Sequence, residues 1–382
     1  MTSYLTRRAL LVGATALGAS LSALRSSCRA GAEILDVRVI GRTGHYQGWP
    51  TLARRSNGEL LLVYSGGREA HVCPFGRVEL LRSRDEGRTW SFPRVLMDGP
   101  IDDRDAGVVE TAHGSILVTT FTSLAYQPIM QKAEQVGDWP GDRLARWQAA
   151  HRRVSAAQRR AAQNVWMIRS IDGGVTFSPC YDPLVNSPHG PIQLSDGRLL
   201  YAGKDLWRNH QRVGASISTD DGQSWQWRAS IPTRDGDRHR DYHELHAVEA
   251  TNGDLIVHVR NHNAKNSRET LQSRSSDGGR TWSVPRAIGV WGLPSHLLRL
   301  SDGRLLMTYG HRRPPFGNQC RLSEDHGKTW SEPIVVSDDG VSSDLGYPTT
   351  VELTGGDLLS VWYELMQGEK NAVLRQARWR LG

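Results

Sequence analysis

Short apolar runs that follow a glycine turn recur along most of this 382-residue chain. Each run begins directly after a pair of turn residues ending in glycine, and apolar side chains bounded by such turns are typical of β-hairpins. Six of these hairpins are present: "NGELLLVYS", "HGSILVTTF", "DGRLLYAGK", "NGDLIVHVR", "DGRLLMTYG" and "GGDLLSVWY". The pattern predicts six repeated β-units.

A second repeated element, an octet of the form SxDxGxTW, follows five of the hairpins. Its copies are "SRDEGRTW" at 83, "SIDGGVTF" at 170, "STDDGQSW" at 218, "SSDGGRTW" at 275 and "SEDHGKTW" at 323. In such an octet, Ser and Asp accept backbone hydrogen bonds, Gly supplies a positive φ, and the aromatic residue packs between neighbouring sheets. Successive copies begin 87, 48, 57 and 48 residues apart. Four-stranded propeller blades repeat about every 40 to 50 residues.

The sixth unit lacks an octet and ends with "AVLRQARWRLG", which leaves its sheet with three strands and an open edge. An additional strand-like segment, "EILDVRVIG", lies at 33–41. We therefore expect residues 33–382 to form an all-β, six-bladed β-propeller whose N-terminal strand closes the last blade.

One segment, residues 128–163, interrupts the regular spacing of the repeats inside the second blade. It is rich in Ala, Arg and Gln, and its apolar residues recur at helical spacing, so it predicts a helical insertion and accounts for the interval of 87 residues. Its basic side chains could form a lid or a docking surface, but an exposed helical face is the preferred interpretation.

The first 32 residues resemble an export signal of the twin-arginine type. Arg7 and Arg8 precede an apolar stretch without acidic residues, and small residues then mark a cleavage site before Glu33. A membrane anchor is disfavoured because the stretch is short and diluted by Gly, Ser and Thr. Lipidation of Cys28 is disfavoured by an arginine three positions before it. The signal predicts a periplasmic or secreted protein without stable membrane insertion after cleavage.

Composition excludes one class of partner. The whole chain carries a net charge of +7, and removal of the signal leaves about +3. This is too little for a nucleic-acid-binding surface. The remaining Cys73, Cys180 and Cys320 are odd in number and lack metal-ligand spacing, so disulfides are not expected to hold the fold together.

Candidate functional residues share one distance from the hairpin glycines. The ninth residue before each glycine should occupy the same height on the innermost strand, and these residues are Trp49, Asp105, Pro188, Glu244, Pro294 and Tyr347. Further ionisable side chains stand beside them: Arg104, His189, His243, His246 and His296. A structural role is as common as a functional one for any single member, but their coincidence at one height predicts a shared site. No metal or other cofactor is expected, because His243 and His246 point to opposite faces of a strand.

The octets are similar to the Asp-box, or BNR repeat, of the sialidase (neuraminidase) superfamily, and the resemblance covers nearly the whole of 33–382. It implies a six-bladed propeller. Asp-boxes lie on the rim and also occur in non-catalytic propellers, so the chemistry must be judged from the axial residues.

The resemblance also implies roles for individual residues. Sialidases use a Tyr nucleophile. A Glu base activates it, three arginines hold the substrate carboxylate, and an Asp serves as acid/base. "HELHAVEATNGDLIVHVRNHN" resembles the fourth blade of the family and implies that Glu244 is the base and Arg260 binds the carboxylate. "LGYPTTVELTGGDLLSVWYE" resembles the last blade and implies that Tyr347 is the nucleophile and Glu364 orients an arginine. Arg312 or Arg313 follows a hairpin where a further arginine is expected.

Two positions depart from the family pattern. "QGWPTL" has Gly48 and Trp49 where the first arginine is expected, and "GGREAHVCPFGR" offers Glu69 and His71 in place of the acid Asp. Candidates to replace the missing arginine and acid are Arg68, Arg104, His45, His71 and, as proton donor, Asp105. Trp49 could stack on a sugar or be a packed core residue.

Three functions are compatible with these residues. The first is an exo-acting glycoside hydrolase of sialidase type that releases a terminal acidic sugar from a glycan. The second is a polysaccharide lyase, or another enzyme acting on a uronate, with Tyr347 and a histidine among His189, His243, His246 and His296. The third is a propeller that binds a glycan without turnover.

Overall fold

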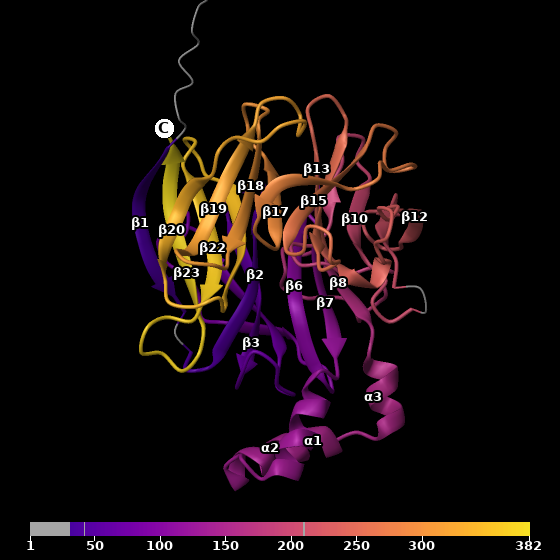
Figure 1. The fold of residues 1–382 in the computed structure, drawn as a ribbon, viewed down its shortest axis with the longest axis vertical. Helices are drawn as coiled ribbons and strands as arrows, with labels where there is room; N and C mark the ends of the chain where they lie inside the picture. Colours follow the sequence, from indigo (N-terminus) through magenta and orange to yellow (C-terminus); the bar gives the residue numbers. More distant parts are fainter. Residues whose placement is uncertain (1–30, 42, 209–210) are drawn as a thin grey trace, which may run out of the picture.

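The computed structural model describes residues 31–41, 43–208 and 211–382, and the strands of these residues form a ring of six sheets (Figure 1). Each sheet is one antiparallel blade, and the first strands of blades 4, 5, 6, 1 and 2 contact each other in that order around the axis. The predicted all-β, six-bladed propeller is confirmed.

The strands are distributed as follows. Blade 1 contains β2 (Tyr46–Arg54), β3 (Leu60–Arg68), β4 (Arg77–Ser83) and β5 (Arg94–Met97), and blade 2 contains β6 (Asp102–Glu110), β7 (Ile116–Ser123) and β8 (Val165–Ser170). Blade 3 contains β9 (Ile192–Gln193), β10 (Leu199–Lys204), β11 (Val213–Ser218) and β12 (Gln226–Ser230). Blade 4 follows a 3-10 turn (His239–Asp241) and contains β13 (Tyr242–Glu249), β14 (Leu255–Asn261), β15 (Glu269–Ser275) and β16 (Arg286–Trp291). Blade 5 contains β17 (Ser295–Arg299), β18 (Leu305–His311), β19 (Phe316–Ser323) and β20 (Ile334–Gly340), and blade 6 contains β21 (Leu345–Glu352), β22 (Leu358–Glu364), β23 (Val373–Leu381) and β1 (Ala32–Ile40).

The hydrophobic core lies between the blades. Buried apolar side chains gather into one cluster at each junction of neighbouring blades, and each cluster takes its members from both. The junction of blades 6 and 1, for example, contains Trp49 and Tyr347 together with Leu62 and Leu359. Because apolar burial is the main favourable contribution to folding, each blade is stabilised chiefly by its two neighbours.

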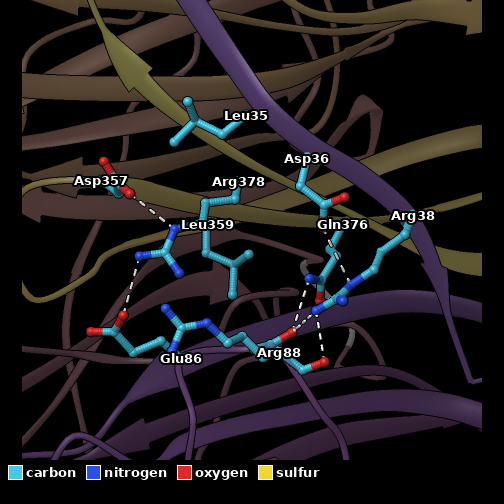
Figure 2. A pocket seen from close by; sticks show the side chains of 10 residues that line it. Leu35, Asp36, Arg38, Glu86, Arg88, Asp357, Leu359, Gln376 and Arg378 are labelled. Atoms are coloured by element: carbon cyan, nitrogen blue, oxygen red, sulfur yellow. Dashed lines mark hydrogen bonds and ion pairs between the residues drawn. The ribbon is translucent and has the colours of Figure 1, made fainter.

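The ring is closed by the N-terminal strand, as the sequence predicts. Strand β1 pairs antiparallel with β23, from Ala32 opposite Leu381 to Ile40 opposite Leu374. Figure 2 shows the groove of about 390 Å³ where this closed blade meets the Asp-box turn of blade 1. There the Gly87 carbonyl accepts hydrogen bonds from Arg38 and from Gln376. The closing strand is therefore joined both to its own blade and to blade 1.

The five octets form the predicted turn. In the first, the Asp85 carboxylate accepts hydrogen bonds from the Thr89 amide at 2.8 Å and from its hydroxyl at 2.6 Å, and Ser83 Oγ accepts one from the Gly87 amide at 2.8 Å. The same Asp and hydroxyl pairing recurs in the other four copies. The Trp90 indole donates to Gln376 of the neighbouring blade at 2.8 Å. The octet thus fixes its own turn and contacts the next sheet.

Blade 2 carries the helical insertion. Three helices follow β7 and stand outside the ring of strands, at the bottom of the view in Figure 1: α1 (Tyr126–Val136), α2 (Gly141–Arg152) and α3 (Ala156–Ala162). Trp147 is fully buried in a cluster with Tyr126 and Cys73. The Glu69 carboxylate accepts hydrogen bonds from Arg146 at 2.6 Å and from the Trp147 indole at 2.7 Å. The insertion is therefore attached to the loop that follows β3.

The same blade differs from the expected four strands. Its sheet has three strands within the described residues. Where the outermost strand would lie, Tyr181 exchanges backbone hydrogen bonds of 2.8 and 2.9 Å with Met167 as a single bridge. The outer edge of blade 2 is reduced to this bridge.

Two other expectations concern the chain as a whole. Cys73 and Cys320 are buried and Cys180 is exposed, and all three are free thiols, so disulfides do not hold the described fold together. In the part of the chain that the structure describes, no helix is long and apolar enough to cross a membrane. The predicted signal lies almost entirely outside the described residues.

Candidate functional site

The innermost strands bend where the candidate residues lie. A β-bulge interrupts β2, β6, β13 and β21 at Trp49, Asp105, Glu244 and Tyr347, respectively. Trp49, Asp105 and Tyr347 adopt φ angles of 52°, 46° and 52°. A non-glycine residue held at positive φ costs about 1 to 3 kcal/mol, and bulges with such residues commonly redirect side chains at functional sites. The recurrence of this strained bend in three blades supports a shared site at this height.

Tyr347, Glu244 and Arg260 form a hydrogen-bonded cluster. The Tyr347 hydroxyl donates to Glu244 Oε1 at 2.7 Å, and Arg260 Nη1 lies 2.9 Å from the same carboxylate oxygen and 3.0 Å from the Tyr347 oxygen. The three side chains come from β21, β13 and β14. The sequence prediction that a phenol and a carboxylate lie side by side is confirmed.

The electrostatics of this cluster keep Tyr347 protonated and Glu244 ionised before a substrate binds. Burial raises the pKa of Tyr347 well above its usual value, and the negative charge of Glu244 raises it further. Burial would also raise the pKa of Glu244, but the adjacent Arg260 guanidinium holds it below the usual range. Glu244 is therefore an ionised acceptor, and the charge of Arg260 would stabilise a phenolate as it forms.

Two histidines support Arg260: His243, which the sequence places beside the axial residues, and His262, which sequence reasoning missed. Arg260 Nε donates to His262 Nε2 at 3.0 Å, and the His262 ring packs against His243 with centroids 4.4 Å apart. Burial lowers the pKa of His262 to about 4, with Arg260 contributing, so His262 is a neutral acceptor at physiological pH. The available signal was the spacing of two residues between Arg260 on β14 and His262, which directly follows this strand.

Asp105 lies close enough to Glu244 for their charges to interact. Burial, with a further contribution from Glu244, raises the pKa of Asp105 to about 7. The opposite pKa shifts of these two carboxyl groups make one a proton donor and the other an acceptor near neutral pH.

Asp105→Asn is expected to stabilise the protein at neutral and higher pH. An unfolded aspartate titrates near 4, whereas the pKa of Asp105 in the fold is about 7. Folding therefore takes up a proton between these pH values, and the free energy of unfolding falls as pH rises through them. In thermal melting from pH 4 to 8, the Tm advantage of the variant should grow with pH. An advantage that stays constant across this range would contradict the assignment.

Two arginines near Tyr347 have unused hydrogen-bonding capacity. Arg312 donates to the Leu345 carbonyl at 2.8 Å and to the Tyr363 hydroxyl at 3.3 Å, and its guanidinium carbon lies 5.5 Å from the centre of the Tyr347 ring. Arg104 lies 4.4 Å above the Trp49 ring, and its nearest carboxylate contact is 3.4 Å long. Both can bind an anion. Arg313 stacks on Trp291 instead.

Three residues do not fit the binding roles expected from the sequence. Arg68 is fully buried and forms a two-pronged ion pair with Asp102 at 2.6 and 3.0 Å, so it cannot replace the missing arginine. Trp49 is 1% exposed, with Arg68 and Arg104 stacked over its ring, so it is a packed residue rather than a sugar platform. Glu364 orients Arg375, at 2.9 Å, rather than an arginine of the site.

The predicted histidines separate into different places. His189, His246 and His296 are buried against each other, with ring centroids 4.6 to 5.3 Å apart. Burial lowers the pKa of each, so they are neutral. Among the described residues, no group of His, Cys, Asp or Glu is arranged to hold a metal ion. His45 is exposed.

His71 lies beside the aromatic residues of the site. Its ring packs edge-on to Trp49 with centroids 5.1 Å apart, and its Nδ1 lies 3.1 Å from Asp344 Oδ1 and 2.7 Å from the Tyr46 hydroxyl. Asp344 and Tyr46 are further residues that the sequence analysis missed. They lie near the starts of β21 and β2, and only the closing of the ring brings them together.

Comparison with known proteins places these observations in a family. A family model described as a BNR repeat-like domain matches residues 138–359. A sialidase of Micromonospora viridifaciens is 26% identical over 310 residues, which are 80% of this chain and 39% of that protein. The chain thus spans about two fifths of the length of this curated relative.

Two solved structures support the fold. A protein of unknown function from Dyadobacter fermentans has a TM-score of 0.72 and 23% identity, with 92% of this chain and 100% of that chain covered. The NanB sialidase of Streptococcus pneumoniae has a TM-score of 0.64 and 15% identity, with 91% and 70% covered.

Proposed function

This chain belongs to the BNR repeat-like family of sialidase-type propellers, and we propose that it is an exo-acting glycoside hydrolase that releases a terminal acidic sugar, sialic acid or a related one, from a glycan. The observation that carries the proposal is the 2.7 Å hydrogen bond from the Tyr347 hydroxyl to Glu244. A site that only binds a glycan needs no ionised base beside a buried phenol, so this pair favours catalysis.

In the proposed reaction, Tyr347 is the nucleophile. Glu244 accepts the phenol proton while the Tyr347 oxygen attacks the anomeric carbon, and Arg260 stabilises the negative charge that develops on this oxygen. A neutral phenol suits this substrate class, because an anionic nucleophile would be repelled by a sugar carboxylate at the same carbon.

The arginines support an anionic substrate. Arg260 already uses Nε and Nη1 on His262, Glu244 and Tyr347, which leaves Nη2 for a ligand. Arg312 and Arg104 supply the other positive charges. We propose that these three guanidiniums bind the sugar carboxylate, with neutral Asp105 available as a hydrogen-bond donor.

The lyase alternative is less well supported. A lyase needs a base that touches the substrate carbon next to a carboxylate. His189, His246 and His296 are between 3% and 7% exposed, and they contact each other. They are not placed for that task, although His243 is partly exposed.

The function is tested by offering the purified protein fluorogenic glycosides of sialic acid, of uronic acids and of neutral sugars. We expect release from an acidic sugar and little release from neutral ones. Absorbance of an unsaturated product without hydrolysis would instead identify a lyase. Binding of glycans on an array without any turnover would identify a binding protein.

We further propose that residues 1–32 direct export of the folded protein to the periplasm or beyond, supported by the paired arginines and the small-residue cleavage pattern. Replacing Arg7 and Arg8 by lysine should retain the protein in the cytoplasm, as measured by cell fractionation. Unchanged export of this variant would reject a twin-arginine route.

A further inference from the structure

We propose that His71, oriented by Asp344, is the general acid/base of the site, protonating the departing glycosidic oxygen and then deprotonating water. The inference rests on the proposed hydrolase function. The sequence indicates His71 only as one of several candidates to replace the missing arginine or acid, whereas the structure supports one chemical role for it, proton transfer.

The contacts of His71 are those of an oriented imidazole. Asp344 Oδ1 lies 3.1 Å from His71 Nδ1, and the Tyr46 hydroxyl lies 2.7 Å from the same nitrogen and 2.9 Å from the carboxylate. An imidazole whose one nitrogen is held by a carboxylate presents the other for proton transfer. The His71 side chain is 45% exposed, so Nε2 can meet a ligand.

The position of His71 fits the geometry of a displacement at the anomeric carbon. Arg68 pairs with Tyr46, the first residue of β2, so the loop that carries His71 extends beyond the ends of the innermost strands. Tyr347 lies on the bulge of β21, below that level. Because the attacking and departing oxygens occupy opposite faces of the sugar carbon, the departing oxygen points towards this loop.

His71 and Tyr347 also belong to one aromatic cluster. Their rings each lie within 6.5 Å of Trp49 and of Tyr363. These shared neighbours place His71 and Tyr347 at the same site.

Two carboxyl groups that could compete for the role are less suitable. Glu69 lies in the same loop, but both of its oxygens are occupied by Arg146 and Trp147 of the insertion. Asp105 lies on the bulge of β6, at the same height as Glu244 and Tyr347, on the side from which the nucleophile attacks. Asp344 is partly exposed too; burial would raise its pKa, but the hydrogen bonds from His71 and Tyr46 hold the pKa below its usual value, so it is an acceptor and His71 is the proton donor.

The two steps balance. In the first, the Tyr347 oxygen bonds to the anomeric carbon, the bond to the departing oxygen breaks, His71 Nε2 gives its proton to that oxygen, and Glu244 takes the phenol proton. In the second, neutral His71 takes a proton from water, and the water oxygen replaces Tyr347 on the carbon. Glu244 then returns the proton to Tyr347, which restores the starting state.

The groups that face His71 set its protonation. They are Asp344, Tyr46, Tyr363, Arg104 and Arg68. Burial lowers the pKa of His71 from its usual value, the two arginines lower it further, and Asp344 opposes them. Because the first step needs the protonated form, kcat for that step should fall as pH rises. Asp344→Asn removes the opposing charge and should move the fall to lower pH.

The test compares leaving groups. For His71→Gln, we expect kcat/KM to fall about 10²- to 10⁴-fold with a sugar alcohol as leaving group, as is usual for loss of general acid catalysis. The loss should be below about 10-fold with 4-nitrophenol, which departs without protonation. Glutamine can keep contacts to Tyr46 and Asp344, and melting curves will verify folding. The exposed His113, in a hairpin turn of blade 2, provides the control His113→Gln, which should match the wild type.

Equal losses for both leaving groups would assign His71 a structural role and overturn the inference, while the hydrolase function would stand. A leaving-group-dependent loss in Asp105→Asn instead of His71→Gln would assign the acid to Asp105. Absence of turnover of any glycoside by the wild type would overturn the proposed function, and this inference with it.

Discussion

Tyr347→Phe should lower kcat/KM by about 10⁴-fold or more, because losses of this order follow removal of a catalytic nucleophile. The variant lacks one oxygen atom, and that oxygen accepts from Arg260 and donates to Glu244 at 3.0 and 2.7 Å. KM is expected to change little, since the arginines that bind the carboxylate remain. The measurement is steady-state kinetics on the acidic glycoside identified by the screen.

A matched control is Tyr309→Phe. Tyr309 is also buried and also donates from its hydroxyl, to Gln319 at 3.0 Å, but it lies in the core between blades 4 and 5. Tyr309→Phe should retain activity near the wild-type value. If Tyr347→Phe did so as well, the phenol would not be the nucleophile. Mass spectrometry of a rapidly quenched reaction should locate a sugar on Tyr347 in the wild type.

Asp102→Ala should cost about 3 to 5 kcal/mol in the free energy of unfolding, the usual loss when one partner of a buried ion pair is removed. Neither Arg68 nor Asp102 exposes its side chain, and the pair is joined at 2.6 and 3.0 Å. Without the carboxylate, a guanidinium stays buried against Trp49 with no compensating charge. Urea unfolding measured by Trp fluorescence would give the difference.

Asp142→Ala is the matched control for this stability measurement. Asp142 forms an ion pair of the same length, 2.6 Å, with Arg146, but both side chains are more than half exposed to solvent. Solvent screens exposed pairs, so little change in stability is expected. Equal effects at the two positions would mean that the Arg68–Asp102 pair is not buried as described.

The blades could be predicted from sequence because their signals are local. Each hairpin and each octet fixes its turn through residues at most a few positions apart, as the Asp85 and Thr89 contacts illustrate. The meeting of Tyr347 with Glu244 was also predictable, because equal distances from hairpin glycines place residues at equal heights on the inner strands, which surround one axis.

The contacts of individual side chains were harder to predict. His246 lies two positions closer to its hairpin glycine than Glu244, so it faces the same side one layer further along the axis, where it meets His189 and His296. The number of residues from a hairpin glycine does not show whether a side chain lies at the site or is buried one layer further along the axis. Arg68 could equally have faced the substrate, and only the buried Asp102 of the next blade decides that it does not.

The strand that completes blade 6 has a consequence for how the protein is made. Strand β1 pairs with residues that lie more than 330 positions later in the sequence, from Leu374 to Leu381. During translation, β1 therefore has no hydrogen-bonding partner until synthesis of the chain is nearly finished. Such non-local pairing is slow, and an unpaired strand edge favours aggregation. Chaperones that shield residues 32–40 during translation should therefore raise the yield of native protein.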